Sequence, residues 1–270
     1  MVNFGLLIIG DEILSGKRTD KHLAKAIELL SARGLQLAYA DYVGDVPGRI
    51  TDALKRAFAS GDVVFSFGGI GATPDDHTRQ CAARALERGM ELHPQAKSLI
   101  LERMRDIANE QGVAFEPERA DNLHRLNMGV FPSGAGIIPN PFNKIPGFFC
   151  SVHGSGGVYF LPGFPVMAHP MMAWVLDTHF SELFARGAWI ERSVIVFDAM
   201  ESTLTPLMEA IEHDHVVKVF SLPSVDHPEY GRHIELGVKG APAAVVAAYD
   251  ELLRGLRTHS VKLGPELVRT

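Results

Sequence analysis

Two hydrophobic periods alternate along the first half of the chain. Short, continuous apolar runs are typical of strands buried on both faces, and apolar residues recurring every three or four positions are typical of amphipathic helices. The predicted strands cover 4–10, 35–44 and 62–67, and the predicted helices cover 21–33, 46–61, 78–88 and 95–110. This strand–helix rhythm predicts an α/β fold, a mostly parallel sheet with helices on both faces.

The texture changes after residue 129. Short β segments and turns fill 129–165, with a hairpin turn expected at His153–Gly157. A helix then covers 166–180, and Pro170 is expected to kink or break it.

A second, smaller unit of α+β type is predicted from about residue 190. Its expected strands are 192–200, 216–224 and 232–240, and its expected helices are 201–213 and 241–256. The pattern therefore predicts an α/β domain at 1–178, a small β-α-β-β-α domain at 190–260 and a frayed tail at 261–270.

Composition narrows the classes of partner. The 270 residues are 46% hydrophobic and 21% charged, as expected for a soluble globular protein, and no apolar run is long enough to cross a membrane. The net charge of −6 comes without a cluster of Lys and Arg, so nucleic acid and membrane are not expected as primary partners. Two cysteines, Cys81 and Cys150, make no disulfide framework, and we expect a cytoplasmic protein.

Acidic and glycine-rich loops follow each of the three predicted strands. They read "GDEILSG", "VGDVPG" and "GGIGATPDD", and they carry Asp11, Asp45, Asp75 and Asp76. Because ligands of parallel sheets bind beyond the carboxyl ends of the strands, we expect the three loops to converge on one pocket. Carboxylate oxygens favour Mg²⁺ or Mn²⁺ held jointly with substrate phosphates. The sequence thus predicts metal ligands at Asp76, Asp75, Asp11 and Asp45, with Asp76, Asp75 and Asp45 as catalytic residues.

Glycines in these loops have two interpretations. Gly68, Gly69 and Gly71 indicate either close approach by a phosphorylated ligand or backbone with positive φ. Thr73 to Asp76 also reads as a helix start with Thr73 as N-cap, and Asp45 as an N-cap of the next helix. The candidate ligand-binding residues are Gly10, Ser15, Gly16, Gly68, Gly69, Gly71, Thr73 and Thr78.

Common nucleotide and hydrolase motifs are not matched. Pro74 stands near where a dinucleotide fingerprint needs its third glycine, and Arg18 follows Lys17 where a phosphate loop needs Ser or Thr. No G-x-S-x-G, H-E-x-x-H or C-x-x-C occurs. Of the twelve histidines, His22 and His77 lie near the glycine loops and merit testing.

As a set, these loops resemble the competence/damage-inducible protein A family. "GDEILSG", "VGDVPGRI", "GGIGATPDDHT", "SGAGIIPNP…IPGF" and "LPGFPVM" follow the order of that family's molybdopterin-binding-like domain over residues 4–176. The second unit looks like the KH-like domain that follows it. The resemblance implies a dimer or trimer that binds a phosphorylated pterin or nucleotide. It also implies a pyrophosphatase acting on ADP-ribose-like nucleotides with Mg²⁺, Mn²⁺ or Co²⁺.

Three departures from the family accompany this resemblance. The amidase domain of longer relatives has no counterpart in the 270 residues, His22 stands where relatives have Asn, and "NLHRLNMGVFPSGA" replaces an Asn-Lys-Gln-Ala stretch. Three alternatives to a pyrophosphatase stay open. They are a non-catalytic carrier of molybdopterin or a nucleotide, adenylyl transfer to molybdopterin, and a scaffold for oligomerisation.

Overall fold

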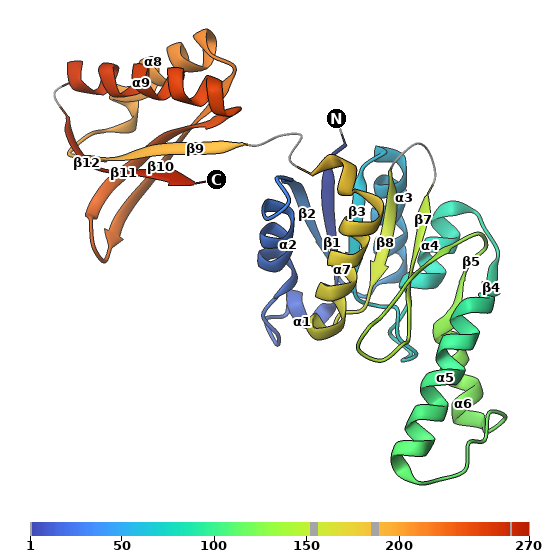
Figure 1. The fold of residues 1–270 in the computed structure, drawn as a ribbon. Coiled ribbons are helices and arrows are strands. Elements are labelled where there is room, and N and C mark those ends of the chain that lie inside the picture. Colours follow the sequence, from blue (N-terminus) through green and yellow to red (C-terminus); the bar gives the residue numbers. More distant parts are fainter. Residues whose placement is uncertain (1, 152–155, 185–188, 260, 270) are drawn as a thin grey trace. The chain divides into compact units, whose positions relative to one another are not determined.

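A six-stranded sheet in the order β2-β1-β3-β8-β7-β6 organises the first of two units, residues 1–184, and a second unit covers residues 185–270 (Figure 1). The structure is a computed structural model that describes residues 2–151, 156–184, 189–259 and 261–269. The parallel neighbours are β1 (Phe4–Ile9), β2 (Leu37–Val43), β3 (Val63–Phe67) and β8 (Gly157–Leu161). The antiparallel additions are β7 (Gly147–Ser151) and β6 (Gly136–Ile138). The predicted mostly parallel sheet is confirmed.

Helices cover both faces of this sheet (Figure 1). They are α2 (His22–Ser31) and α7 (Pro165–His179) on one face, with α3 (Pro47–Ser60) and α4 (Thr78–Leu86) on the other. Along β1, Leu6 and Ile8 join the core under α2 and α7, while Leu7 and Ile9 join the core under α3 and α4. Because successive side chains of a strand point to opposite faces, burial on both sides explains the continuous apolar run.

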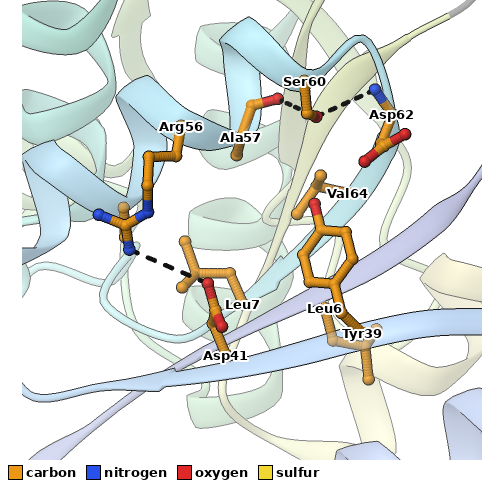
Figure 2. Close-up of a pocket in the computed structure, with 10 residues that line it drawn as sticks. Leu6, Leu7, Tyr39, Asp41, Arg56, Ala57, Ser60, Asp62 and Val64 are labelled. Carbon is orange, nitrogen blue, oxygen red and sulfur yellow. Dashed lines mark hydrogen bonds and ion pairs between the residues drawn. The ribbon is translucent and has the colours of Figure 1, made fainter.

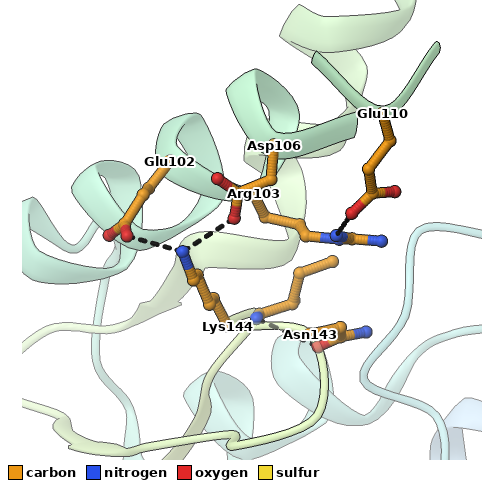
Figure 3. Close-up of polar contacts among 7 residues, drawn as sticks. Glu102, Arg103, Asp106, Glu110, Asn143 and Lys144 are labelled. Carbon is orange, nitrogen blue, oxygen red and sulfur yellow. Dashed lines mark hydrogen bonds and ion pairs between the residues drawn. The ribbon is translucent and has the colours of Figure 1, made fainter. Parts of the chain in front are cut away.

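A lobe of the first unit is built on a two-stranded sheet of β4 (Met90–Leu92) and β5 (Val130–Pro132). Its helices are α5 (Pro94–Gln111), α6 (Ala120–Arg125) and the 3₁₀ turn η1 (Leu126–Gly129). Lys144 Nζ, in the turn between β6 and β7, lies 2.6 Å from Glu102 and 2.7 Å from Asp106 of α5 (Figure 3). These ion pairs fasten α5 to the main sheet.

Two local expectations of this unit meet different outcomes. Helix α7 runs without a break through Pro170, whose ring is exposed, so the expected break is wrong. The turn expected at His153–Gly157 falls mostly outside the described residues, although β7 and β8 pair antiparallel on either side of it. The short elements α1 (Asp11–Leu14) and η2 (Ser181–Leu183) complete the unit.

The second unit is a four-stranded antiparallel sheet in the order β10-β11-β9-β12. Its elements are β9 (Ile190–Phe197), α8 (Glu201–Asp214), β10 (Val217–His227), β11 (Gly231–Gly240), α9 (Pro242–Thr258) and β12 (Lys262–Arg269). The tail predicted at 261–270 is therefore wrong, because β12 pairs with β9, Leu263 lying opposite Val196. A register shift between Leu263 and Glu266 interrupts the alternation of apolar and polar residues from which this strand could have been predicted.

Candidate functional site

Two of the three strand-terminal loops are joined by a reciprocal pair of hydrogen bonds. The backbone N–H of Asp11 donates to Asp45 Oδ2 at 2.8 Å, and the backbone N–H of Asp45 donates to Asp11 Oδ1 at 3.2 Å. Gly44 permits this contact, because a Cβ there would lie 2.3 Å from Asp11 Oδ1. The structure thus brings Asp11 and Asp45 together, and Gly44 is a site residue that the sequence reading missed.

Acidic side chains crowd around Asp45. Burial is the largest cause that raises the pKa of Asp45, and the negative charges of Asp11, Glu12 and Asp75 raise it further. The hydrogen bond from the Asp11 N–H acts in the opposite direction. Carboxylates from all three loops therefore lie within electrostatic reach of one another, which is an arrangement that a cation would relieve.

Asp76 is engaged by its own loop. Its Oδ2 accepts hydrogen bonds from the Thr73 N–H at 2.8 Å and from Thr73 Oγ1 at 2.5 Å, and the Asp76 N–H donates to the Thr73 carbonyl at 3.0 Å. This closes a turn ahead of α4, which begins only at Thr78, with His77 as its N-cap residue. Asp75, by contrast, is exposed. The helix start predicted with Thr73 as N-cap is therefore wrong, although Thr73 does hold one oxygen of Asp76. A hydrogen bond with the Thr73 side chain is the largest cause that lowers the pKa of Asp75.

Backbone geometry explains two of the three glycines in the third loop. Gly68 has φ 100° and Gly69 has φ 68°. A Cβ at Gly68 would lie 2.3 Å from the Ile9 carbonyl oxygen, and a Cβ at Gly69 would lie 2.2 Å from Thr78 Oγ1. Thr78 Oγ1 donates to the Gly68 carbonyl at 3.0 Å. These glycines are required by the packing of β3 against β1 and α4, whether or not a ligand binds.

The same loop leaves donors free and borders a pocket. Among the described residues, the backbone N–H groups of residues 69–72 donate no hydrogen bond. A pocket of about 540 Å³ adjoins the loop. Its lining residues are Ala72, Thr73, Pro74, Asp76, His77, Arg79, Gln80, Met90, His124, Asn127 and Val130. Of the four residues with unpaired N–H groups, Ala72 lines this pocket, whereas Asp11, Asp45 and Asp75 do not, so the expected convergence of all three loops on one pocket is not seen here. Unpaired N–H groups of a loop suit an anionic ligand.

The remaining predicted residues occupy the edge of this region. The Ser15 N–H donates to the Asp11 carbonyl at 2.8 Å, and Gly16, with φ 72°, makes the turn after α1. His22 is 5% exposed, stacks on Phe67 with ring centroids 4.4 Å apart and has a pKa lowered by burial. His22 is thus a neutral core side chain beneath the loops, and Gly10 joins the ends of two strands through its N–H to the Val43 carbonyl at 3.0 Å.

A divalent cation would need oxygen atoms beyond those of the protein. Within the described residues, no three His, Cys, Asp or Glu side chains form a cluster suited to a metal ion. Asp11 Oδ2 and Asp45 Oδ1 make no hydrogen bond there, so two carboxylates have one oxygen each to offer. Mg²⁺ is commonly held by one or two carboxylates together with waters and substrate phosphates, and that donor set fits these residues.

Arg79 is a second residue that the sequence reading missed. Its side chain is 4% exposed, and its Nη2 donates to the Gly71 carbonyl at 2.6 Å while its Nη1 donates to the Asn127 carbonyl. The pattern around α4 gave no signal, because the partners of Arg79 lie outside the helix, one in the third loop and one in η1, 48 positions away.

A separate pocket of about 230 Å³ lies between β2 and α3 (Figure 2). Tyr39, Asp41, Arg56, Ser60 and Asp62 are its polar lining, and Asp41 Oδ2 is 4.0 Å from Arg56 Nη2. None of the predicted site residues lines it. Its walls come from the middle and the amino ends of the strands, so it is not the predicted strand-end site.

Comparison with known proteins identifies the family. The family described as "Probable molybdopterin binding domain" matches residues 5–181, so the chain belongs to this family. The chain is 30% identical to a protein of Aeropyrum pernix over 204 residues, which is 76% of this chain and 72% of that protein. It is also 31% identical to a CinA-like protein of Syntrophotalea carbinolica over 166 residues, 61% of this chain and 37% of that protein.

A solved structure agrees with this assignment. The crystal structure of the protein CinA with unknown function from Thermoplasma acidophilum is 27% identical, with a TM-score of 0.54, over 65% of this chain and 96% of that one. The expected relation to competence/damage-inducible proteins is thereby confirmed. The chain spans little more than a third of the CinA-like protein of S. carbinolica. Among the described residues, no helix is both long and apolar enough to span a bilayer.

Proposed function

We propose that the chain is a divalent-metal-dependent pyrophosphatase acting on a nucleotide of the ADP-ribose type. The observation that supports the proposal is the convergence of Asp11, Asp45 and Asp75 beside a glycine turn with free backbone N–H groups. Acids alone would repel a pyrophosphate, and N–H groups alone would bind it without a cation. Together they match a substrate that arrives with Mg²⁺, Mn²⁺ or Co²⁺ bound to its phosphates.

Each part of the site has a role in this proposal. A bound cation supplies charge neutralisation and orients or activates water for attack on phosphorus. Asp11 and Asp45 would hold such a cation through their free oxygens, and their mutual backbone contacts fix the distance between the two loops. Asp75 is exposed and able to hold a water or the cation, while Asp76 keeps the loop closed through Thr73. The N–H groups of residues 69–72 hold phosphate oxygens.

Hydrolysis of ADP-ribose, measured as AMP release, tests the proposal. We expect turnover with Mg²⁺, Mn²⁺ or Co²⁺ and none in EDTA. Asp45→Asn and Asp75→Asn are expected to lower kcat by at least about a hundredfold, the lower end of what a positioned group in a reacting site contributes. Asp52→Asn on the exposed face of α3 is the matched control and should keep wild-type turnover. Unchanged kcat in both site variants would refute the proposal.

A binding protein without chemistry is the second candidate, because Asp76, Gly68 and Gly69 have structural reasons of their own. It predicts saturable binding of molybdopterin or a nucleotide and no product with any metal. Adenylyl transfer to molybdopterin would instead need ATP and the pterin together. Light scattering will show whether the chain forms the dimer or trimer that we expect.

A further inference from the structure

The pocket beside the third loop contains a buried positive charge. Arg79 stands in the first turn of α4, is 4% exposed and lines the pocket of about 540 Å³. Among the described residues, no carboxylate oxygen lies within 4.0 Å of its guanidinium nitrogens. A buried guanidinium without a carboxylate partner is costly to fold, since desolvation of the charge is not repaid by an opposite one.

The contacts that Arg79 does make are neutral. Two of its five N–H groups donate to the carbonyl oxygens of Gly71 and Asn127, and its Nε has no partner among the described residues. Burial lowers the pKa of Arg79, and the negative charge of Asp76 acts in the opposite direction. However, the Asp76 Oδ2 is already occupied by Thr73. The guanidinium therefore retains hydrogen-bonding capacity, and the charge of Asp76 acts on it only from beyond ion-pair distance.

The rest of the pocket wall suits the same kind of ligand. His124 Nε2 donates to the Ala72 carbonyl at 3.0 Å, and His124 Nδ1 lies 3.4 Å from Asn127 Nδ2. Met90 and Val130 add an apolar patch. Asp76 also lines the pocket, but its Oδ2 is held by Thr73. A cation, neutral polar groups and an apolar patch beside this carboxylate, in a pocket of this size, suit an anionic group attached to a ring.

We infer that this pocket binds a phosphate group of the ligand, with Arg79 as its anion-binding side chain. The inference rests on the proposed function for the chemical class of the ligand, a phosphorylated nucleotide or pterin. Arg79 also joins the third loop to η1 through its carbonyl contacts, so an occupied pocket would stiffen the loop that carries Asp75 and Asp76.

Calorimetric titration with inorganic pyrophosphate in EDTA tests this inference without metal or chemistry. We expect saturable binding by the wild-type chain and at least a tenfold loss of affinity in Arg79→Met. Arg56→Met removes a largely exposed guanidinium that does not line the pocket, and this variant should bind as the wild type does. Wild-type affinity in Arg79→Met, with or without a lowered melting temperature, would mean that Arg79 is only a structural tie and would overturn the inference.

Gln80 provides variants that leave the fold intact, because it is exposed and lines the same pocket. Gln80→Lys should strengthen pyrophosphate binding several-fold and Gln80→Glu should weaken it by a similar factor, while equal affinities in the two would overturn the inference. The pair decides the question even if Arg79→Met does not fold. Pyrophosphate binding that depends on Arg79, without hydrolysis of ADP-ribose, leaves the inference standing and refutes the pyrophosphatase. Hydrolysis of ADP-ribose with an unchanged KM in Arg79→Met and Gln80→Glu would support the pyrophosphatase and overturn the inference about Arg79.

Discussion

Gly68 provides the sharpest test of how the third loop is built. Its φ of 100° and the 2.3 Å that would separate an added Cβ from the Ile9 carbonyl oxygen are two separate penalties for any side chain. The left-handed backbone costs an L-residue about 1–2 kcal/mol. Forcing a methyl group against a neighbouring strand adds about 1–3 kcal/mol. We therefore expect Gly68→Ala to lower the free energy of unfolding of the first unit by about 3.5 kcal/mol.

Gly16 is the matched control, because it has φ 72° but no heavy atom within 4 Å of a would-be Cβ. Gly16→Ala should cost about 1.5 kcal/mol, the backbone penalty alone. For a unit of this size about 1 kcal/mol corresponds to roughly 2–4 °C, so the melting temperatures should fall by roughly 7–14 °C for Gly68→Ala and 3–6 °C for Gly16→Ala.

Trp174 in α7 reports on the first unit once Trp189, the other tryptophan, is replaced by Phe. Thermal unfolding followed by its fluorescence isolates this unit from the second one. Equal shifts for Gly68→Ala and Gly16→Ala would show that the approach to Ile9 carries no energetic weight, and the account of the glycine turn would then be wrong.

Three further outcomes follow from the charges and from β12. The folded-state pKa of Asp45 is raised above 3.8, so the contribution of this carboxyl to stability is fully present below pH 3.8 and is lost as the pH rises. Asp45→Asn in EDTA should therefore have a higher melting temperature than the wild type at pH 7 and the same melting temperature at pH 3. Arg33 lowers the pKa of Asp177, so the stability from this pair is present above pH 3.8 and is lost as the pH falls. Asp177→Asn should therefore have a lower melting temperature than the wild type at pH 7, and equal melting temperatures at pH 7 would contradict the pairing. A chain that stops after His259 loses β12 and should destabilise the second unit by at least about 2 kcal/mol, as circular dichroism will show, while Trp174 reports an unchanged first unit.

Hydrophobic periodicity was sufficient to predict a helix or strand where the same faces of that element are buried along its whole length. The run at 4–10 predicted β1 because both of its faces lie in apolar cores, and the spacing of Ile50, Leu54 and Phe58 predicted α3 because one face of the helix is buried. β12 was not predicted, because Gly264 and Pro265 lie inside the strand and one register shift interrupts its pairing.

The candidate site was predictable only in its outline. The position of Asp11 and Asp45 directly after predicted strands indicated that they belong to the site, and the structure places them in mutual contact. Arg79 was not predicted, because a charged residue on a helix is normally solvated. Its contacts, the carbonyl oxygens of Gly71 and the distant Asn127, lie outside the helix. Gly44 was missed for a similar reason, since the atom that excludes a side chain there comes from Asp11 in another loop.

The position of β9 in the second sheet has a consequence during synthesis of the chain. β9 is the first strand of its sheet to be made, yet one of its two neighbours, β12, follows only after residues 198–261. At about 5–20 residues per second, the ribosome leaves that edge without its partner for roughly 3–13 s. During this interval the nascent sheet exposes a row of backbone donors and acceptors to any other extended polypeptide nearby. A chaperone that shields β9 would therefore raise the yield of folded protein.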